Sequence, residues 1–352
     1  MLRIRNHGVR ALVAMAALGV SMSPLAADFD PRSHAETRQL VEELTAKGIE
    51  RDWLEAAMAS ADFQQGVLDA MAGAAERRLR WDEYREIFLQ PERIHRGVTF
   101  LEVHRDAFER AEAEYGVPAE VIAAIIGVET SYGRFTGRHR VIDSLATLAF
   151  HHPTRGGFFR GELAAFLEIT HEQGVDPGEL TGSYAGAMGY PQFIPTSYRA
   201  YAVDFDDDGI RDLWTNPVDA IGSVGNYFAE HGWRAGEAIY HDAEGPATPP
   251  ETIEFNRAAR PPAVAASDIA EAGITVPDAF DADRPLLPVS LEDGEDNWRY
   301  VLGDHNFYVI TRYNHSHLYA MAVTELAEAI EAARALDAHW LQAVQANGEG
   351  QP

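Results

Sequence analysis

The sequence predicts a mainly α-helical protein that carries a small β segment. Apolar residues recur every three or four positions from residue 34 to residue 115, which is the period of an amphipathic helix. Residues 119–132 have the most apolar helical pattern of the chain, and it ends at Gly133. Prolines cluster between residues 232 and 296, where the helical period disappears. Of the 352 residues, 46% are apolar and 24% are charged, which is typical of a globular protein.

The first 27 residues predict a signal peptide rather than a part of the fold. Three arginines among residues 1–10 precede an apolar run from Ala11 to Val20, and small residues follow up to Ala26 and Ala27. This order is that of a secretory signal, with cleavage after one of these two alanines. The alternative is an uncleaved membrane anchor, but the run is shorter than the roughly 20 residues that a membrane span needs. We therefore expect an exported protein without a membrane anchor, periplasmic in a bacterium with two membranes.

An N-terminal helical region over residues 28–115 and a helical core over residues 116–231 follow. Phe63, Val67 and Met71 show the helical spacing of the first region. The sequence Gly-Val-Pro at 116–118 ends one helix and begins the next, because proline is favoured at the first helical position. In the core we expect helices over residues 119–132, 159–171 and 217–231, a glycine-rich loop over 181–192 and an acidic loop over 204–214.

Residues 232–313 predict an irregular segment with a small β structure. Trp298–Leu302 and Phe307–Tyr313 are rich in residues that favour strands, and turn-forming residues separate them. We therefore expect these two stretches to pair as a β-hairpin. The last segment, residues 314–352, has a helical pattern from Tyr319 to Val344, which predicts a closing helix that packs on the helical region.

Charge and cysteine content exclude several classes of function. The formal net charge is -26, and a chain this acidic repels phosphate backbones, so we expect no binding to nucleic acid. The chain contains no cysteine. This excludes disulfides, thiolate metal sites, cysteine nucleophiles and attachment of a lipid to an N-terminal cysteine.

Glu129 is the strongest candidate for a catalytic residue. It lies four residues after Ile125 and seven after Ile122, so it shares the apolar face of its helix. Burial raises the pKa of a carboxyl group, and a carboxylic acid that stays protonated near neutral pH can protonate a glycosidic oxygen. The alternative is a structural glutamate, paired in the core with Arg134, Arg138 or Arg140.

Three blocks of sequence resemble the lytic murein transglycosylases of the B type, glycoside hydrolase family 103. The blocks are Gly127–Gly133, Ser183–Pro195 and Arg312–Ala320, and the resemblance runs from about Trp81 to about Leu326. It implies a goose-lysozyme-like α domain with an additional helical region and a small β segment. It also implies a substrate, the glycan strands of peptidoglycan, and other cell-wall enzymes are conceivable partners.

The same resemblance implies that Glu129 is the only acid and base of the reaction. It would protonate the bond between N-acetylmuramic acid and N-acetylglucosamine, and then accept the proton of the muramic C6 hydroxyl as a 1,6-anhydro ring closes. No organic cofactor is needed. Ordinary two-carboxylate hydrolysis needs a second acid, and the nearest one downstream is Asp143. The rival hypotheses are a hydrolytic, lysozyme-like muramidase and a non-catalytic protein that binds peptidoglycan as a scaffold.

The glycine-rich block predicts part of a sugar-binding groove. Gly186 and Gly189 would let a sugar approach the backbone, Gln192 offers a donor and an acceptor, and the rings of Tyr190 and Phe193 could stack on a sugar. Tight packing of helices through small residues is the alternative. The resemblance extends the expected groove to five further residues: Tyr84, Ser183, Tyr227, Tyr313 and Asn314.

The acidic loop predicts a calcium site. Asp204, Asp206 and Asp208 occupy the first, third and fifth positions of an EF-hand loop, and Ile210 would contribute its carbonyl. The glutamate expected at the twelfth position is missing. The resemblance implies that Asp219, on the next helix, closes the site instead. The alternative is a solvated acidic turn, but carboxylates this close repel one another without a cation. We expect a structural role for the ion.

Overall fold

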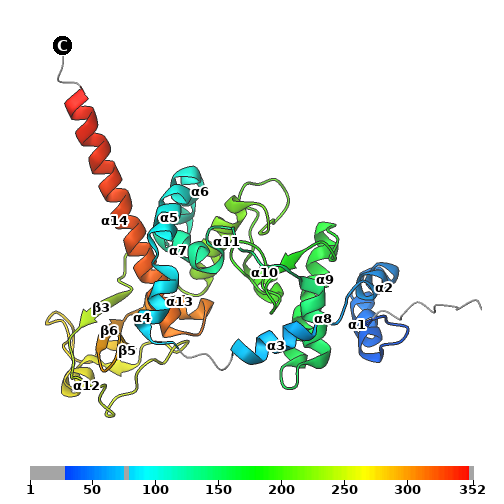
Figure 1. Cartoon of the computed structure of the whole chain (residues 1–352), viewed down its shortest axis with the longest axis horizontal. Coiled ribbons are helices and arrows are strands. Elements are labelled where there is room, and N and C mark those ends of the chain that lie inside the picture. The colour runs from blue at the N-terminus through cyan, green and yellow to red at the C-terminus, as the bar shows by residue number, and fades with distance from the viewer. Residues whose placement is uncertain (1–27, 75–78, 349–352) are drawn as a thin grey trace, which may run out of the picture.

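The computed structural model describes residues 28–74 and 79–348, and it shows an elongated, mostly helical molecule (Figure 1). The expected mainly α fold with a small β part is confirmed. The predicted signal peptide, residues 1–27, lies outside the described residues. Among the residues that are described, no helix combines the length and the apolarity that crossing a membrane requires.

The N-terminal region consists of helices, as the three-and-four spacing predicts. They are α1 (Ala35–Ala46), α2 (Arg51–Ala59), α3 (Gln65–Ala74), α4 (Trp81–Phe88), α5 (Pro91–Val103) and α6 (Arg105–Tyr115). The first three lie at one end of the molecule, beside α8 and α9 of the core, while α4 lies near the sheet at the other end (Figure 1). Gly116 ends α6 in a left-handed conformation (φ 69°), which glycine adopts without a steric cost.

The core contains five helices and a short two-stranded ladder. They are α7 (Ala119–Thr130), α8 (Val141–His151), α9 (Gly156–Gln173), α10 (Pro195–Tyr201), α11 (Pro217–Glu230), β1 (His139–Arg140) and β2 (Thr181–Gly182). The expected helices over 119–132, 159–171 and 217–231 are therefore confirmed within a few residues at each end. The sequence reasoning did not identify α8. α7 is buried on almost every side, which explains its uniformly apolar sequence.

Residues 240–303 form a four-stranded antiparallel sheet in the order β3-β6-β5-β4. The strands are β3 (Tyr240–Ala243), β4 (Val264–Ala265), β5 (Pro285–Glu292) and β6 (Trp298–Gly303), and α12 (Ala266–Glu271) packs beside them. β5 and β6 form the hairpin, with Glu292 opposite Trp298 and Leu287 opposite Gly303. The region is therefore more regular than the sequence suggested.

The expectation that Phe307–Tyr313 is a strand is wrong. These residues belong to helix α13 (His305–Tyr313), and the strand that pairs with β6 precedes it in the chain. The buried side chains of α13 include Asn306, Phe307 and Ile310, which recur at the helical spacing. A short apolar run is compatible with either a strand or a helix. β5, which precedes β6 in the chain, is its partner in the hairpin. The hairpin therefore forms without a strand after β6.

The last helix, α14 (His317–Gly348), packs its first turns against α4, α5 and α7 and then projects from the body (Figure 1). Tyr319, Met321, Val323 and Leu326 are fully or almost fully buried in this contact. One hydrophobic cluster joins these residues to α7 and to the N-terminal helices. The start of α14 therefore lies directly beside the end of α7, where Glu129 is located.

Candidate active site

Glu129 lies in the last turn of α7, and an unusual reversal of the backbone fixes that turn. Ser131 and Tyr132 both adopt positive φ angles of 50° and 61°. Their amides donate to the carbonyls of Gly127 and Ile126 at 3.0 Å and 3.2 Å. A reversal of this kind is usually made by glycine or asparagine, so two residues with larger side chains indicate a conformation held by its surroundings.

The side chain of Tyr132 supplies that constraint. A Cβ atom added at Gly97 of α5 or at Gly127 of α7 would lie within 2.6 Å of the Tyr132 hydroxyl oxygen. Only glycine leaves room for this ring between the two helices, and the ring in turn contacts Phe100 at a centroid distance of 5.5 Å. The glycines at positions 97 and 127 therefore serve the packing of Tyr132 and set the position of the helix end.

Hydrogen bonds bring the three blocks of sequence together at this point. The hydroxyl of Thr130 donates to the carbonyl of Tyr190 at 3.0 Å, which joins the first block to the second. Tyr313 donates to the carbonyl of Pro191 at 2.6 Å, which joins the third block to the second. Tyr319 donates to Oε1 of Glu129 at 2.6 Å, which joins the third block to the first. Segments about 190 positions apart in the chain thus meet at one carboxyl group.

The surroundings of Glu129 favour its protonated form. Burial raises its pKa to about 7, although the hydrogen bond from Tyr319 acts in the opposite direction. Among residues 28–74 and 79–348, no second carboxyl group contributes to this pKa and no arginine pairs with Glu129. Arg140 instead contacts Asp143 at 3.0 Å. The alternative of an arginine-paired structural glutamate is therefore wrong.

Three tyrosines surround Glu129 and remain neutral. Burial and the nearby charge of Glu129 raise the pKa of Tyr84 to about 12. The same two causes hold the pKa values of Tyr313 and Tyr319 well above the ordinary value. The rings of Tyr313 and Tyr319 stack with an interplanar angle of 12°. The carboxyl group therefore lies among neutral hydroxyl groups.

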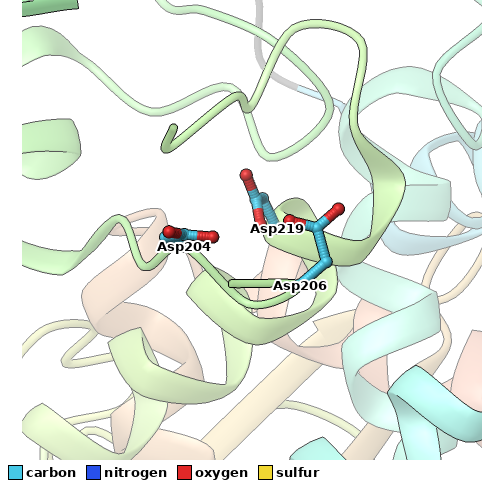
Figure 2. Close-up of side chains that lie close together, drawn as sticks. All are labelled: Asp204, Asp206 and Asp219. Carbon is cyan, nitrogen blue, oxygen red and sulfur yellow. The ribbon is translucent and has the colours of Figure 1, made fainter. Parts of the chain in front are cut away.

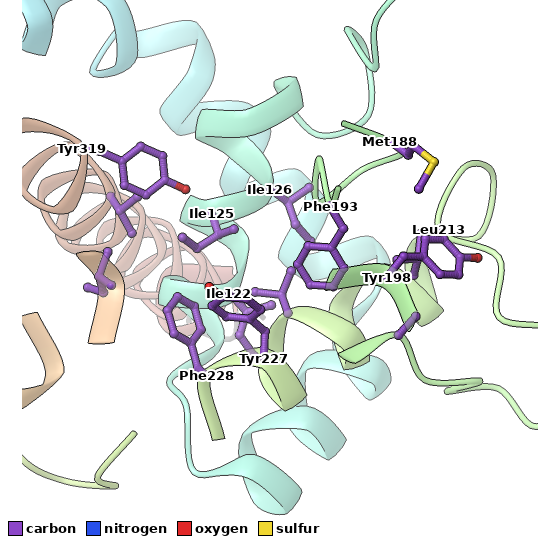
Figure 3. Close-up of a cluster of buried hydrophobic side chains, with 14 of the residues drawn as sticks. Ile122, Ile125, Ile126, Met188, Phe193, Tyr198, Leu213, Tyr227, Phe228 and Tyr319 are labelled. Carbon is purple, nitrogen blue, oxygen red and sulfur yellow. The ribbon is translucent and has the colours of Figure 1, made fainter. Parts of the chain in front are cut away.

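Two of the expected groove residues lie beneath the site rather than on its surface. Phe193 is 2% exposed and Tyr227 is 6% exposed, and their ring centroids are 5.6 Å apart (Figure 3). The Tyr227 hydroxyl donates to the carbonyl of Arg312 at 2.7 Å. Stacking of Phe193 on a sugar is therefore contradicted, because its ring faces are already covered. Both rings support Tyr313, which packs on them.

The glycine-rich block has a different role from the one expected. A Cβ atom at Gly189 would lie 2.1 Å from the carbonyl oxygen of Leu213, and one at Gly186 would lie 2.4 Å from Leu145. These glycines serve internal packing, so the expectation that they admit a sugar is wrong. The amide of Gln192 donates to the carbonyls of Thr136 and Gly189 at 3.1 Å and 2.9 Å, which holds the loop closed.

The remaining expected groove residues are partly or fully accessible. Ser183 accepts hydrogen bonds from the amides of Ala185 and Ala187, which shapes the turn that precedes the second block. Tyr84 is partly buried on α4, and Asn314 is exposed where α13 ends. Sequence reasoning missed Tyr319 as a site residue, although it stands in the third block. A tyrosine on the apolar face of a helix is usually a packing residue. Only the hydrogen bond from its hydroxyl to Glu129 identifies Tyr319 as part of the site.

The acidic loop gathers three carboxylates of the five predicted ligands. Asp204, Asp206 and Asp219 each offer an oxygen within 4.8 Å of the others (Figure 2). Asp219 is fully buried and accepts the amides of Phe205 and Asp212 at 2.6 Å and 2.8 Å. Its position on the first turn of α11 is the one that the resemblance implied. Clustered carboxylate oxygens are the donors that Ca²⁺ prefers.

The side chain of Asp208 is not part of this cluster of three carboxylates. The carboxylate of Asp208 accepts the amide of Ile210 at 2.8 Å, a local turn contact. The carboxylate of Asp204 likewise accepts the amides of Asp208 and Gly209. Binding of an ion by Asp208 and by the carbonyl of Ile210 stays a prediction from the EF-hand spacing.

Comparison with known proteins agrees with this arrangement. The family model described as "Transglycosylase SLT domain" matches residues 32–328. The chain is 40% identical over 315 residues to a curated protein of Escherichia coli, "Membrane-bound lytic murein transglycosylase B", covering 87% of this chain and 85% of that protein.

Three solved structures are also similar. The soluble lytic transglycosylase SltB1 of Pseudomonas aeruginosa is 45% identical with a TM-score of 0.79, over 85% of this chain and 99% of that one. The Escherichia coli lytic transglycosylase Slt35, in complex with calcium, is 41% identical with a TM-score of 0.78, over 85% and 93%. SltB3 of Pseudomonas aeruginosa, in complex with NAG-anhNAM-pentapeptide, is 30% identical with a TM-score of 0.71, over 84% and 79%. The chain therefore belongs to the transglycosylase SLT family and stands among its lytic murein transglycosylases.

Proposed function

We propose that this enzyme cleaves the β-1,4 bond between N-acetylmuramic acid and N-acetylglucosamine in peptidoglycan, with Glu129 as its only acid and base. The observation that carries the proposal is the pKa of about 7 of a carboxyl group held by Tyr319, without a second carboxylate beside it among the described residues. Near neutral pH such a group exists in both forms, so it can donate a proton and later accept one.

The reaction divides into two proton transfers. The protonated carboxyl of Glu129 donates to the glycosidic oxygen as the bond from that oxygen to C1 of the muramic ring breaks. The N-acetyl group of the muramic residue supplies the electron pair that stabilises C1. The carboxylate of Glu129 then accepts the proton of the C6 hydroxyl, whose oxygen bonds to C1 as the bond from C1 to the N-acetyl oxygen breaks, which closes the 1,6-anhydro ring. Glu129 thus gives up one proton and takes one back, and no water is consumed.

Mass spectrometry of the fragments released from purified sacculi tests this reaction. We expect 1,6-anhydromuramic ends without new reducing termini, and we expect Glu129→Gln to reduce the rate by at least about 10⁴-fold because both transfers are lost. New reducing termini would instead identify a hydrolytic muramidase on the same site. A Glu129→Gln variant with undiminished lysis would show that the carboxyl group is structural.

Groove contacts are proposed for the accessible residues of the three blocks. Tyr84, Ser183 and Asn314 are partly or fully exposed and carry groups that hydrogen-bond to sugars. Tyr313, Phe193 and Tyr227 support this surface from below, and Gln192 holds the loop. On this hypothesis, Asn314→Ala weakens binding of the glycan, whereas Phe193→Ala weakens the fold as well.

A structural Ca²⁺ is proposed for the acidic cluster. The three carboxylates of Asp204, Asp206 and Asp219 supply hard oxygen ligands of the kind found in calcium sites. The relative Slt35 is described in complex with calcium. Asp219 joins the loop to the start of α11, so an ion there would connect these two segments. Calorimetric titration with Ca²⁺ would detect binding.

A periplasmic location is proposed on the basis of the substrate and of the first 27 residues. Peptidoglycan lies outside the cytoplasmic membrane, and the N-terminal pattern of charge and apolarity is that of an export signal. The intact mass of the protein from a periplasmic extract tests this proposal. A chain that retained residues 1–27 in the membrane fraction would contradict it.

A further inference from the structure

One buried carboxylate, that of Glu325 on α14, binds guanidinium groups from two other elements. Nε of Arg85 on α4 donates to its Oε2 at 2.6 Å, and Arg299 on β6 donates to its Oε1. Arg299 also contacts Asp242 of β3 at 3.0 Å. Glu325 is 8% exposed, and a buried carboxylate needs such partners to offset the loss of its hydration. These ion pairs tie α4 and the small sheet to α14, the helix that carries Tyr319.

Helix α4 depends on contacts of this kind for its position. It has only 8 residues, and a helix this short is not stable by itself in water. It packs on α14 and on β5 (Figure 1). The side chain of Trp81 in its first turn is buried, and Arg85 stands four residues later on the same face of the helix. The buried ring and the ion pair with Glu325 are therefore two anchors about one turn apart.

The pair of Arg85 with Glu325 is also the polar attachment of α4 to the rest of the protein. Among residues 28–74 and 79–348, it is the one ion pair that joins α4 to another element. Arg80, just before the helix, is paired with Asp82 at 3.0 Å, and Asp82 belongs to α4 itself. Loss of the pair with Glu325 would therefore leave α4 held by apolar contacts alone, which do not fix direction as an ion pair does.

Tyr84, which precedes Arg85, takes its position from α4. It lines a cavity together with residues 316–318, which directly precede Tyr319 in the chain. The charge of Glu129 contributes to the raised pKa of Tyr84, so the two side chains are close. Glu129 itself lies on α7 and is bonded to Tyr319 of α14. A displacement of α4 would therefore move Tyr84 relative to Glu129 without moving the carboxyl group.

We propose that Glu325 is a positioning residue of this enzyme, and that through Arg85 it holds Tyr84 beside Glu129, where Tyr84 contacts the glycan. The proposal rests on the glycan contact of Tyr84 proposed above. Glu325 is itself buried and engaged by two arginines, so it acts through Tyr84 and not by contact with the substrate. Loss of the pair should weaken binding of the glycan and leave the two proton transfers almost unchanged.

Steady-state kinetics on soluble glycan strands test this role. Arg85→Met breaks the α4 side of the network and leaves Glu325 paired with Arg299, so the buried carboxylate keeps a partner. We expect KM to rise about tenfold, the effect of roughly one lost hydrogen bond to the glycan, and kcat to change less than about twofold. Glu325→Ala should raise KM at least as much. Arg85→Lys should restore most of the affinity, because it keeps a cation beside Glu325.

A double-mutant cycle with Tyr84 separates positioning from a general effect on the fold. If Glu325 and Arg85 act through Tyr84, Arg85→Met should raise KM no further in a protein that already carries Tyr84→Ala. Additive effects of the two changes would overturn the proposal. A Tyr84→Ala variant with the wild-type KM would also overturn it, because Glu325 would then have no glycan contact to position.

Asp242→Asn is the matched control. Asp242 is an exposed member of the same network, and it contacts Arg299 on the side of the sheet, so its loss leaves the pair of Arg85 with Glu325 intact. This variant should keep the wild-type KM, and a rise equal to that of Arg85→Met would refute the role of α4. Failure of the proposed chemistry is a separate result, since it appears as new reducing termini or as lysis by Glu129→Gln and not in these KM values.

Discussion

The hydroxyl of Tyr319 donates a hydrogen bond of 2.6 Å to Oε1 of Glu129, although the two residues stand 190 positions apart in the chain. This bond lowers the pKa of Glu129, while burial raises it, and burial prevails to give a pKa of about 7. The tyrosine therefore lowers the proton affinity of this carboxyl group without carrying a charge itself.

Tyr319→Phe should move the pH dependence of the reaction. In the wild type, kcat/KM should fall above pH 7, because the acid form of Glu129 is then depleted. Removal of the donor takes away the contact that favours the carboxylate, so the pKa rises and the fall should begin at a higher pH. The pH profile of lysis of sacculi measures this shift. A variant with lower activity but an unchanged profile would show that Tyr319 acts only through packing.

Glu129→Gln should change how stability depends on pH. The folded-state pKa of about 7 exceeds the ordinary 4.5, so the folded protein binds the proton more tightly than the unfolded chain. The wild type should therefore lose up to roughly 3 kcal/mol of unfolding free energy, relative to the Gln variant, as the pH rises from about 4.5 to about 7. Urea unfolding at several pH values measures the difference. If the free energy of unfolding depended on pH in the same way in the wild type and in the Gln variant, the raised pKa of Glu129 would be contradicted.

Ca²⁺ should stabilise the protein through the acidic cluster. A ligand that binds only the folded state adds about 2.7 kcal/mol when its concentration is a hundred times its dissociation constant. Asp206→Asn should remove most of this gain, because Asp206 belongs to the cluster. Asp207→Asn is the control, since the neighbouring Asp207 lies outside it. We would compare the melting temperatures of the two variants with Ca²⁺ and with a chelator. If Ca²⁺ raised the melting temperature of both variants equally, the loop would be a solvated acidic turn instead of a calcium site.

Gly189→Ala should destabilise the fold through a steric clash. The new methyl group would lie 2.1 Å from the carbonyl oxygen of Leu213, and the residue has a φ angle of 68°. Gly174 has nearly the same φ, 65°, but nothing lies within 4 Å of its added Cβ. Gly174→Ala therefore measures the backbone cost alone, about 1–3 kcal/mol. Gly189→Ala should cost at least about 1 kcal/mol more. Equal losses in denaturant unfolding would refute the packing role of Gly189.

Local features of this protein could be predicted from the sequence. The helical period, the apolar face that contains Glu129 and the acidic loop at 204–212 each depend on residues that are neighbours in the chain. Their geometry follows from the backbone repeat and needs no knowledge of distant segments. The three blocks of resemblance also identified the segments that meet at the site.

Distant contacts were decided only by the tertiary structure. Phe307–Tyr313 became a helix because β5 was the available partner for β6. Asp219 joins Asp204 and Asp206 because the first turn of α11 lies beside the loop. Gly189 faces Leu213 instead of a ligand. A helical or strand pattern specifies which face of a segment is apolar, but the partner of that face depends on how all the segments pack together. The sequence by itself therefore determined that Glu129 lies on the apolar face of its helix, and only the packing of α14 against α7 determined that Tyr319 donates a hydrogen bond to it.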